Sequence, residues 1–306
     1  MRRLHNWLTL GPLFLAFAVL LSPIAVFADG FTYNGFGSVA GLTFKGSAAT
    51  AVTTDGTVLR LTTANFSESG AVYSSLPFTL GASDIFSTQF QFRFTNPGGI
   101  DPADGITLVL AANPNGLGGA GGGMGYTGVP SSVAIEFNTY NNGLNLPTDA
   151  SSNHVAIDTN GALNDLALSN VYGNGSCGFT NGFPAQNPNT VPGCMSNGQL
   201  WTATITYDGS NLSVTLLDPT EGSTFNAITN YPINISSFLG TNNAFVGFTA
   251  GTGSGFENHD IVNWQFANTA TLPTPEPNSL SLVGTGLLAV MAITWRRKRL
   301  VARTLA

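Results

Sequence analysis

The sequence predicts an all-β domain built as an antiparallel β-sandwich, and three observations carry this prediction. Glycine and small polar residues are abundant, and 21 of the 306 residues are Phe. Short apolar runs are separated by turn residues along the chain. Between residues 31 and 268, no segment keeps a sustained helical period of apolar residues. Because such sandwiches often fill about 240 residues as one domain, no second domain is needed.

The predicted strands combine β-branched and aromatic residues with an alternation of period two. In the run 86–94, for example, phenylalanines alternate with polar residues, so one face of the strand is expected to be buried and the other exposed to solvent. Asp208-Gly209, between two alternating runs, is a hairpin signal. The clearest predicted strands cover residues 42–44, 57–62, 71–75, 86–94, 106–111, 133–140, 155–158, 201–207, 212–217 and 244–249.

The amino-terminal residues 1–28 have the pattern of a secretory signal peptide. Arg2 and Arg3 precede an apolar run from Leu13 to Phe27, and Ala28 follows it at the predicted cleavage position. The rest of the chain is therefore expected to be exported.

The carboxyl-terminal residues fall into three segments of different composition. Residues 269–278 form a linker that contains Pro275-Glu276-Pro277, residues 279–295 are uncharged and apolar, and residues 296–306 are basic. An apolar helix of this length reaches about 26 Å, at the short end of what crosses a bilayer core. Four consecutive basic residues favour a transmembrane segment with a cytoplasmic tail over a buried core helix. We therefore expect a domain at 29–268 that is held, at least transiently, at the outer face of the membrane.

The charge is distributed unevenly. The formal net charge is −6, but residues 29–275 carry only three basic and fifteen acidic residues, an excess of twelve negative charges. Such a surface repels phosphate backbones, which excludes nucleic acid as a partner class. Neutral ligands and cations fit it better.

The two cysteines, Cys177 and Cys194, both lie in the exported part. In an oxidising compartment they are expected to pair, and closing a loop of this length stabilises the fold by roughly 3 kcal/mol. Two cysteines without neighbouring histidines are weak evidence for a zinc site.

One predicted strand and the segment after it contain side chains of the kinds that bind metal ions. The predicted strand 133–140 projects a carboxylate and an amide from one face, and further oxygen donors and a histidine follow. Oxygen ligands suit calcium, and a carboxylate with an imidazole suits a first-row transition ion. Residue types alone leave open the alternative of solvated acids and a structural histidine. The candidate ligands are Glu136, Asn138, Asn142, Asp149 and His154.

Seven segments of the exported part follow one another in a characteristic order and spacing: Ala71–Ser74, Phe86–Phe90, Ala103–Ile106, Val133–Tyr140, His154–Asp158, Val246–Ala250 and His259–Trp264. Taken together, from about Phe31 to Phe266, they resemble the legume (L-type) lectins, and the carboxyl end with Pro275-Glu276-Pro277 resembles the PEP-CTERM sorting signal. The resemblance implies a concanavalin A-like jelly roll.

The resemblance also implies two metal ions. Glu136 and His154 would bind a manganese-type ion, while Asn142 and the carbonyl oxygen of Tyr140 would bind calcium. Two aspartates bridge the ions in the family, one in the loop, here Asp149, and one on the strand, where this chain has Asn138. Because an amide removes a negative charge, we expect calcium to persist and the second ion to be weak or absent.

The sugar site implied by the resemblance lies beside the metals. It would use Asp104, Gly123 or its neighbour Gly122, Asn142 and Tyr140, with Ser254 and Gly255 in a loop that closes one side. Carboxylate, amide and hydrogen-bond donors pair with hydroxyl groups, and an aromatic face covers the apolar side of a sugar ring. The family also has a cis peptide bond before the aspartate, here Ala103-Asp104. The alternative for Asp104-Gly105 is a plain turn.

The sequence thus predicts a non-catalytic, calcium-dependent lectin that binds a glycan or exopolysaccharide at the bacterial surface. Its partners would include an exosortase-type processing enzyme and, by family resemblance, a second copy paired through the back sheets. A structural matrix protein without sugar binding is one alternative. A glycoside hydrolase is another, but it needs paired carboxylates roughly 5 to 9.5 Å apart. The strand of Glu136 has no second carboxylate two or four residues further on.

Overall fold

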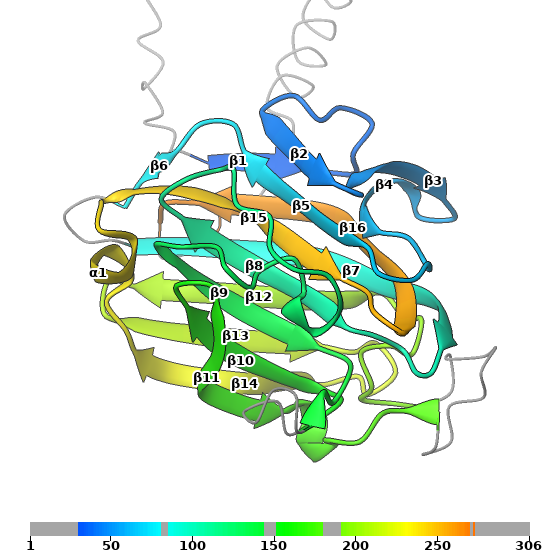
Figure 1. Ribbon diagram of the computed structural model, residues 1–306. Helices are drawn as coiled ribbons and strands as arrows, with labels where there is room; N and C mark the ends of the chain where they lie inside the picture. The colour runs from blue at the N-terminus through cyan, green and yellow to red at the C-terminus, as the bar shows by residue number, and fades with distance from the viewer. Residues whose placement is uncertain (1–29, 81–84, 144–150, 180–190, 270–271, 273–306) are drawn as a thin grey trace, which may run out of the picture.

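The computed structural model describes residues 30–80, 85–143, 151–179, 191–269 and 272. They form two antiparallel sheets that pack face to face, with eight strands in each (Figure 1), so the predicted all-β sandwich is confirmed. The predicted signal peptide, carboxyl-terminal span and basic tail lie outside the described residues. Among the residues that are described, no helix has both the length and the apolar character needed to cross a membrane.

One sheet, called the back sheet here, contains the longest strands. In spatial order its strands are β14 (Thr224–Pro232), β13 (Asn211–Leu217), β12 (Trp201–Asp208), β7 (Ile85–Gly99), β16 (Gly255–Ala267), β4 (Gly56–Thr62) and β3 (Ala49–Thr53), with β1 (Gly30–Tyr33) also paired to β16.

The other sheet, called the front sheet, carries the candidate metal ligands. In spatial order its strands are β11 (Ala162–Asn170), β10 (His154–Thr159), β9 (Ser132–Asn138), β8 (Gly105–Ala111), β15 (Asn243–Gly251), β5 (Ser69–Ser74) and β2 (Leu42–Gly46), with β6 (Phe78–Thr79) beside β15. The short helices are α1 (Ile235–Leu239), η1 (Gly121–Gly123) and η3 (Val171–Gly173).

The core lies between the sheets and is rich in aromatic rings. The alternation predicted for β7 is confirmed, because Phe90, Phe92 and Phe94 are buried while the intervening polar residues are not. The ring of Phe90 lies 4.8 Å from that of Phe248 on β15 and 5.5 Å from that of Phe137 on β9. Such edge-to-face contacts add to the stabilisation from burial, and here they join the two sheets directly behind the site.

A glycine-rich segment, residues 112–131, lies across the outer face of the front sheet. Tyr126 and Ala134 belong to one buried cluster on this face. Gly125 has φ +65°, and a Cβ there would lie 2.7 Å from the carbonyl oxygen of Ala250. Only glycine permits this approach, so the segment covers the polar side chains of the front sheet.

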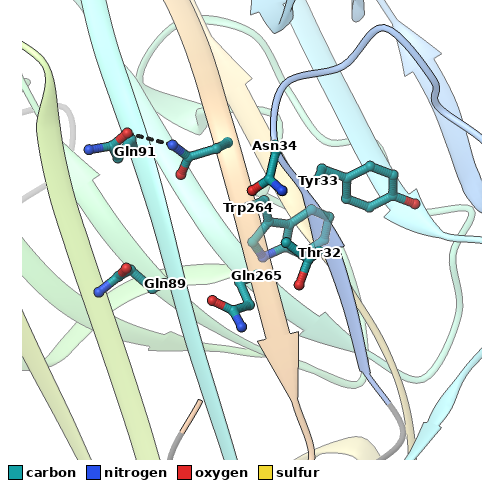
Figure 2. A pocket seen from close by; sticks show the side chains of 8 residues that line it. Thr32, Tyr33, Asn34, Gln89, Gln91, Trp264 and Gln265 are labelled. Carbon is teal, nitrogen blue, oxygen red and sulfur yellow. Dashed lines mark hydrogen bonds between the residues drawn. The ribbon is translucent and has the colours of Figure 1, made fainter. Parts of the chain in front are cut away.

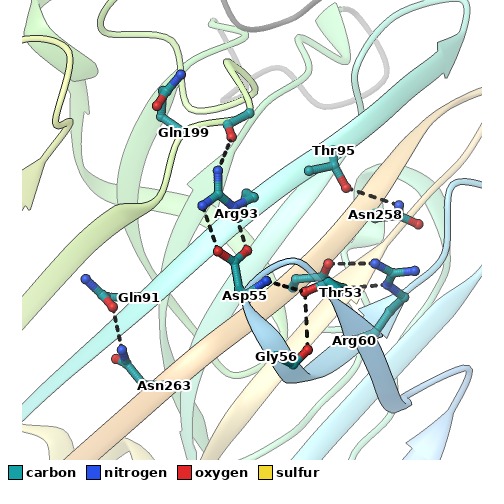
Figure 3. A network of polar contacts seen from close by, with 12 residues as sticks. Thr53, Asp55, Gly56, Arg60, Gln91, Arg93, Thr95, Gln199, Asn258 and Asn263 are labelled. Carbon is teal, nitrogen blue, oxygen red and sulfur yellow. Dashed lines mark hydrogen bonds and ion pairs between the residues drawn. The ribbon is translucent and has the colours of Figure 1, made fainter. Parts of the chain in front are cut away.

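Two ion pairs brace the outer face of the back sheet (Figure 3). Arg93 donates to both carboxylate oxygens of Asp55, at 2.7 and 2.9 Å, and Arg60 donates to both oxygens of Asp260, each at 2.7 Å. The hydrogen bond to Asp260 raises the pKa of Arg60. Both arginines of residues 29–275 are therefore engaged in ion pairs on the back sheet.

Candidate functional site

Glu136, Asn138 and His154 lie together on the outer face of the front sheet, as the sequence predicts. The β9–β10 register places His154 opposite Asn138, with Glu136 two residues along β9. Glu136 and His154 are 1% and 0% exposed. Their nearest ligand atoms, Glu136 Oε1 and His154 Nε2, are 3.4 Å apart. Two ligand atoms that each lie about 2.1 Å from one ion are separated from each other by a similar distance. The pair therefore has the spacing of metal ligands.

Asn138 acts as a hydrogen-bonding bridge within this group. Its amide nitrogen donates to Glu136 Oε1 at 2.7 Å, and its amide oxygen accepts the backbone N–H of Tyr140 at 2.7 Å. The amide thus presents hydrogen atoms to Glu136, where a second carboxylate would present lone pairs. This side of the site lacks the bridging carboxylate that the family resemblance would place there.

The hydrogen bond at the other nitrogen of His154 determines what His154 presents to Glu136. His154 Nδ1 lies 3.0 Å from the carbonyl oxygen of Ser151. Because a carbonyl oxygen can only accept, Nδ1 carries a proton, so a neutral ring directs the lone pair of Nε2 towards Glu136. In that state two lone-pair atoms face each other in a buried site, an arrangement that suits a cation.

A second histidine–glutamate pair provides a contrast. His259 Nε2 lies 3.5 Å from Glu257 Oε1, and both residues are fully buried. Here, however, His259 Nδ1 contacts the hydroxyl group of Thr62 at 2.6 Å, and a hydroxyl can donate as well as accept. A neutral His259 can therefore carry its proton on Nε2, facing Glu257, whereas a neutral His154 cannot.

A second carboxylate, that of Asp165 on β11, joins Glu136 and His154. One potential ligand atom from each of the three residues lies within 4.8 Å of the other two. Asp158 on β10 is nearby, and burial, the charge of Glu136 and contact with its carboxyl group raise the pKa of Asp158 well above its usual value. Sequence reasoning missed Asp165 because it lies in an irregular part of an edge strand, which gives no periodic signal.

No basic side chain neutralises these acids. Residues 29–275 contain only Lys45, Arg60 and Arg93 as basic residues. Lys45 donates to Asn115, and both arginines pair with aspartates on the back sheet. Buried charges are costly unless they are paired. The residues therefore fit a divalent cation bound by Glu136, His154 and Asp165.

The predicted sugar-binding residues converge at the neighbouring end of the front sheet. Asp104 is 3% exposed, and the peptide bond that precedes it, Ala103-Asp104, is cis as the resemblance implied. A Cβ built on Gly253 would lie 3.4 Å from Asp104 Oδ2, and one on Gly121 would lie 4.0 Å from it. A Cβ on Gly122 would lie 2.6 Å from the side-chain amide of Asn142. Glycine backbone thus lines the space between a carboxylate and an amide.

The remaining predicted residues lie less directly on this space. A Cβ on Gly123 would lie 3.1 Å from the hydroxyl oxygen of Thr127, whereas one on Gly122 would meet Asn142. Ser254 accepts the N–H of Ile100 through its carbonyl oxygen, and Gly255 is paired to Gly99 in the sheet. The neighbour that approaches Asp104 is instead Gly253.

The oxygen donors predicted for calcium follow the end of β9. The backbone of Tyr140 is fixed by the side chain of Asn138, and Asn142 lies against Gly122. Amide and carbonyl oxygens are donors that calcium accepts. Asp149, the remaining predicted ligand, lies outside the described residues.

The predicted disulfide between Cys177 and Cys194 is confirmed, with the two Cα atoms 5.8 Å apart. It supports the segment that leads into His154. The amide nitrogen of Asn153 donates to the carbonyl oxygens of Gly193 at 2.8 Å and Asn174 at 2.9 Å, and its oxygen accepts the N–H of Met195 at 3.0 Å. The bridged loop therefore holds His154 in place from behind.

A separate hollow of about 270 Å³ lies on the outer face of the back sheet (Figure 2). It is lined by uncharged amide and hydroxyl groups, and Gln89 and Gln91 donate within it to threonines of β12. It belongs to the sheet that does not carry Glu136. The residues that line it are Thr32, Tyr33, Asn34, Gln89, Gln91, Asn263, Trp264 and Gln265.

Comparisons with known proteins agree with this geometry. The family model described as the legume lectin domain matches residues 28–281, and the PEP-CTERM protein-sorting motif matches residues 273–298. The chain is 29% identical over 203 residues to a bark lectin of Styphnolobium japonicum, which covers 62% of this chain and 63% of that protein. It is 28% identical over 285 residues to a putative L-type lectin-domain containing receptor kinase I.1 of Arabidopsis thaliana, covering 89% of this chain and 39% of the kinase. The chain thus spans less than two thirds of each relative.

Solved structures with the same fold include several plant lectins. Peanut lectin with a 9mer peptide superposes with a TM-score of 0.62 at 24% identity, covering 81% of this chain and 99% of that one. Basic winged bean lectin with Tn-antigen gives 0.61 at 24% identity, covering 81% and 100%. The metal-free form of lectin I-B4 from Griffonia simplicifolia gives 0.61 at 24% identity, covering 78% and 99%. At these identities the likeness concerns the fold.

Proposed function

We propose that this chain, which belongs to the legume lectin family, is an exported protein that binds a glycan or exopolysaccharide at the bacterial surface in a calcium-dependent manner. The family consists of non-catalytic carbohydrate-binding proteins, and the PEP-CTERM motif implies export and sorting by an exosortase. To this family property the proposal adds calcium dependence, a glycan at the bacterial surface, and the residues that would contact it.

The observation that carries the proposal is the convergence of Asp104, Asn142 and glycine backbone at one end of the front sheet. The carboxylate of Asp104 would accept hydrogen bonds from two hydroxyl groups of a sugar, and the amide of Asn142 would donate one. Gly121, Gly122 and Gly253 would let the ring approach the backbone closely. The side chain of Tyr140, which is only half-buried, would cover an apolar face of the ring.

Calcium would be held by the carbonyl oxygen of Tyr140 and the side chains of Asn142 and Asp149, with Asn138 behind them. When bound, the ion would fix the amide of Asn142 in the orientation that the glycan requires. Chelation is therefore expected to abolish glycan binding and to lower the stability of the domain.

The test is a glycan array probed with the purified protein, with calcium and with excess chelator. We expect binding with calcium only, loss of binding in Asp104→Asn, and unchanged binding in Gln89→Ala, which alters the hollow on the back sheet. Binding that survives exhaustive chelation, or that survives Asp104→Asn but not Gln89→Ala, would contradict the proposal.

The structural-matrix alternative makes a different prediction. The PEP-CTERM motif at residues 273–298 is the observation that favours it. A folded, metal-loaded protein that binds no glycan on the array or in isolated exopolysaccharide would support the matrix role and reject the lectin role.

A further inference from the structure

We propose that Asp165 is a ligand of the transition-metal site, and that it supplies from β11 the carboxylate that Asn138 does not supply from β9. The site would then hold a first-row divalent ion between Glu136, His154 and Asp165. This inference deepens the proposed function, because the ion would stabilise the front sheet beside the glycan site. It also replaces the expectation that the second ion is weak or absent.

The backbone of β11 delivers Asp165 to the site. Ile157 pairs with Ala167 and Thr159 pairs with Ala162, so a single residue of β10 faces four residues of β11. Within this bulge Asp165 has φ +45°, in the left-handed region that few residues other than glycine adopt. Bulges re-aim side chains next to functional sites, and this one directs a carboxylate towards β9.

The bulge is held by hydrogen bonds to one side chain. Asp158 Oδ1 accepts the backbone N–H of Asn164 at 2.7 Å and that of Asp165 at 3.0 Å. The residue opposite Glu136 in the ladder is Ala156, whose methyl side chain leaves room above the strand. Asp158 is therefore a positioning residue, and Asp165 has space to reach the site.

A second, independent observation points to a cation. His154 Nε2 is fully buried, faces the cluster and makes no hydrogen bond to any described residue. In the neutral ring the carbonyl oxygen of Ser151 sets the tautomer, so Nε2 then offers a lone pair to an ion. The pair of His259 and Glu257 has the same residue types, similar spacing and likewise an Nε2 without a hydrogen-bond partner. Its tautomer is not fixed by a carbonyl oxygen, however, and among the described residues no second carboxylate or further ligand completes a group there.

The charge of the group suits a divalent ion. Two carboxylates and a neutral imidazole carry a charge of −2, and this donor set is one that zinc, manganese and their neighbours accept. An amide at position 138 would then be tolerated, because the carboxylate count is restored from another strand.

The experiment measures metal binding without sugar. Isothermal titration calorimetry of the purified, chelator-stripped protein with MnCl2, followed by ZnCl2, is compared for wild type, Asp165→Asn and the double variant Asn138→Asp/Asp165→Asn. Loss of a partner outside the ligand shell already lowers affinity about 10- to 100-fold. We therefore expect Asp165→Asn to weaken binding by at least about tenfold, and the double variant to recover most of this loss.

The control removes the same charge at the other end of the sandwich. Asp208 caps the hairpin between β12 and β13 by accepting the N–H groups of Ser210 and Asn211, and Asp208→Asn should bind the metal like the wild type. Circular dichroism of each variant distinguishes loss of a ligand from loss of the fold.

The proposal is overturned if Asp165→Asn binds manganese as the wild type does, or if the folded wild type binds neither ion. It is also overturned if the double variant stays as weak as Asp165→Asn while remaining folded. These outcomes are separate from a failure of the proposed function, which would appear as stoichiometric metal binding in a protein that binds no glycan.

Discussion

Removing the disulfide should destabilise the domain and also weaken the metal site. The bridge joins residues 17 positions apart. In the chain-entropy relation, a closed loop of about this length restricts the unfolded chain by about 10 cal/mol/K, or about 3 kcal/mol at 25 °C. Small-domain stabilities are about 5 to 15 kcal/mol, so the double variant Cys177→Ser/Cys194→Ser should lose a large share of the total.

The assay is urea unfolding followed by the fluorescence of the buried Trp201 and Trp264, with chelator present so that metal release does not contribute. Wild-type protein reduced with dithiothreitol serves as the matched control and should unfold with the variant. Manganese affinity should fall as well, because the bridged loop holds Asn153 and, through it, the segment of His154. A stability change below about 1 kcal/mol, far short of the chain-entropy estimate, would refute the reasoning, as would an unchanged metal affinity in a clearly destabilised variant.

Three further substitutions test the packing around the site. Phe248→Ala removes the ring that joins the sheets behind it and should cost about 3 to 5 kcal/mol in urea unfolding; a loss under about 1 kcal/mol would mean that the core collapses around the gap. Asn153→Ala leaves three hydrogen-bond partners of a buried side chain unsatisfied and should cost about 2 to 4 kcal/mol, while Asn226→Ala at an exposed position of β14, measured alongside, should change little. Gly125→Ala places a Cβ 2.7 Å from the carbonyl oxygen of Ala250 at a positive φ and should lower the melting temperature in differential scanning calorimetry; an unchanged value would show that the glycine-rich segment is not pressed onto the front sheet.

Ten strands could be predicted from the sequence because short β-branched and aromatic runs lie between turn residues. Alternating burial marks strands such as β12 and β13, whereas β8, β9 and β10 are buried on both faces. Four of the strands that were not predicted, β1, β3, β11 and β14, lie at or beside sheet edges, where a residue contacts fewer neighbours and the alternation is weak. The central strand β16 was not predicted because it buries Glu257 and His259 in positions where the periodic pattern requires apolar residues.

In the candidate site as well, residues on regular strands could be predicted from the sequence, and residues in irregular backbone could not. Glu136 and Asn138 lie on one regular strand, so the period of two placed them on one face, and the family resemblance added His154 from the next strand, where the register pairs it with Asn138. Asp165 reaches the same face through a bulge and a left-handed backbone conformation, and neither can be read from residue spacing. Which of Gly122 and Gly123 lies against Asn142 likewise depends on the turn geometry of η1, which residue spacing does not give.

The pairing of β1 with β16 determines which way the domain would face. Gly30 pairs with Ala267, so the first and last strands of the described domain end side by side. At the other end of β16, Gly255 lies next to Ala103 and Asp101, beside the candidate glycan site. Twelve residue steps of about 3.3 Å separate the two ends by about 40 Å. If the domain were tethered through its carboxyl-terminal side, the attachment would therefore lie at the end of β16 far from Asp104.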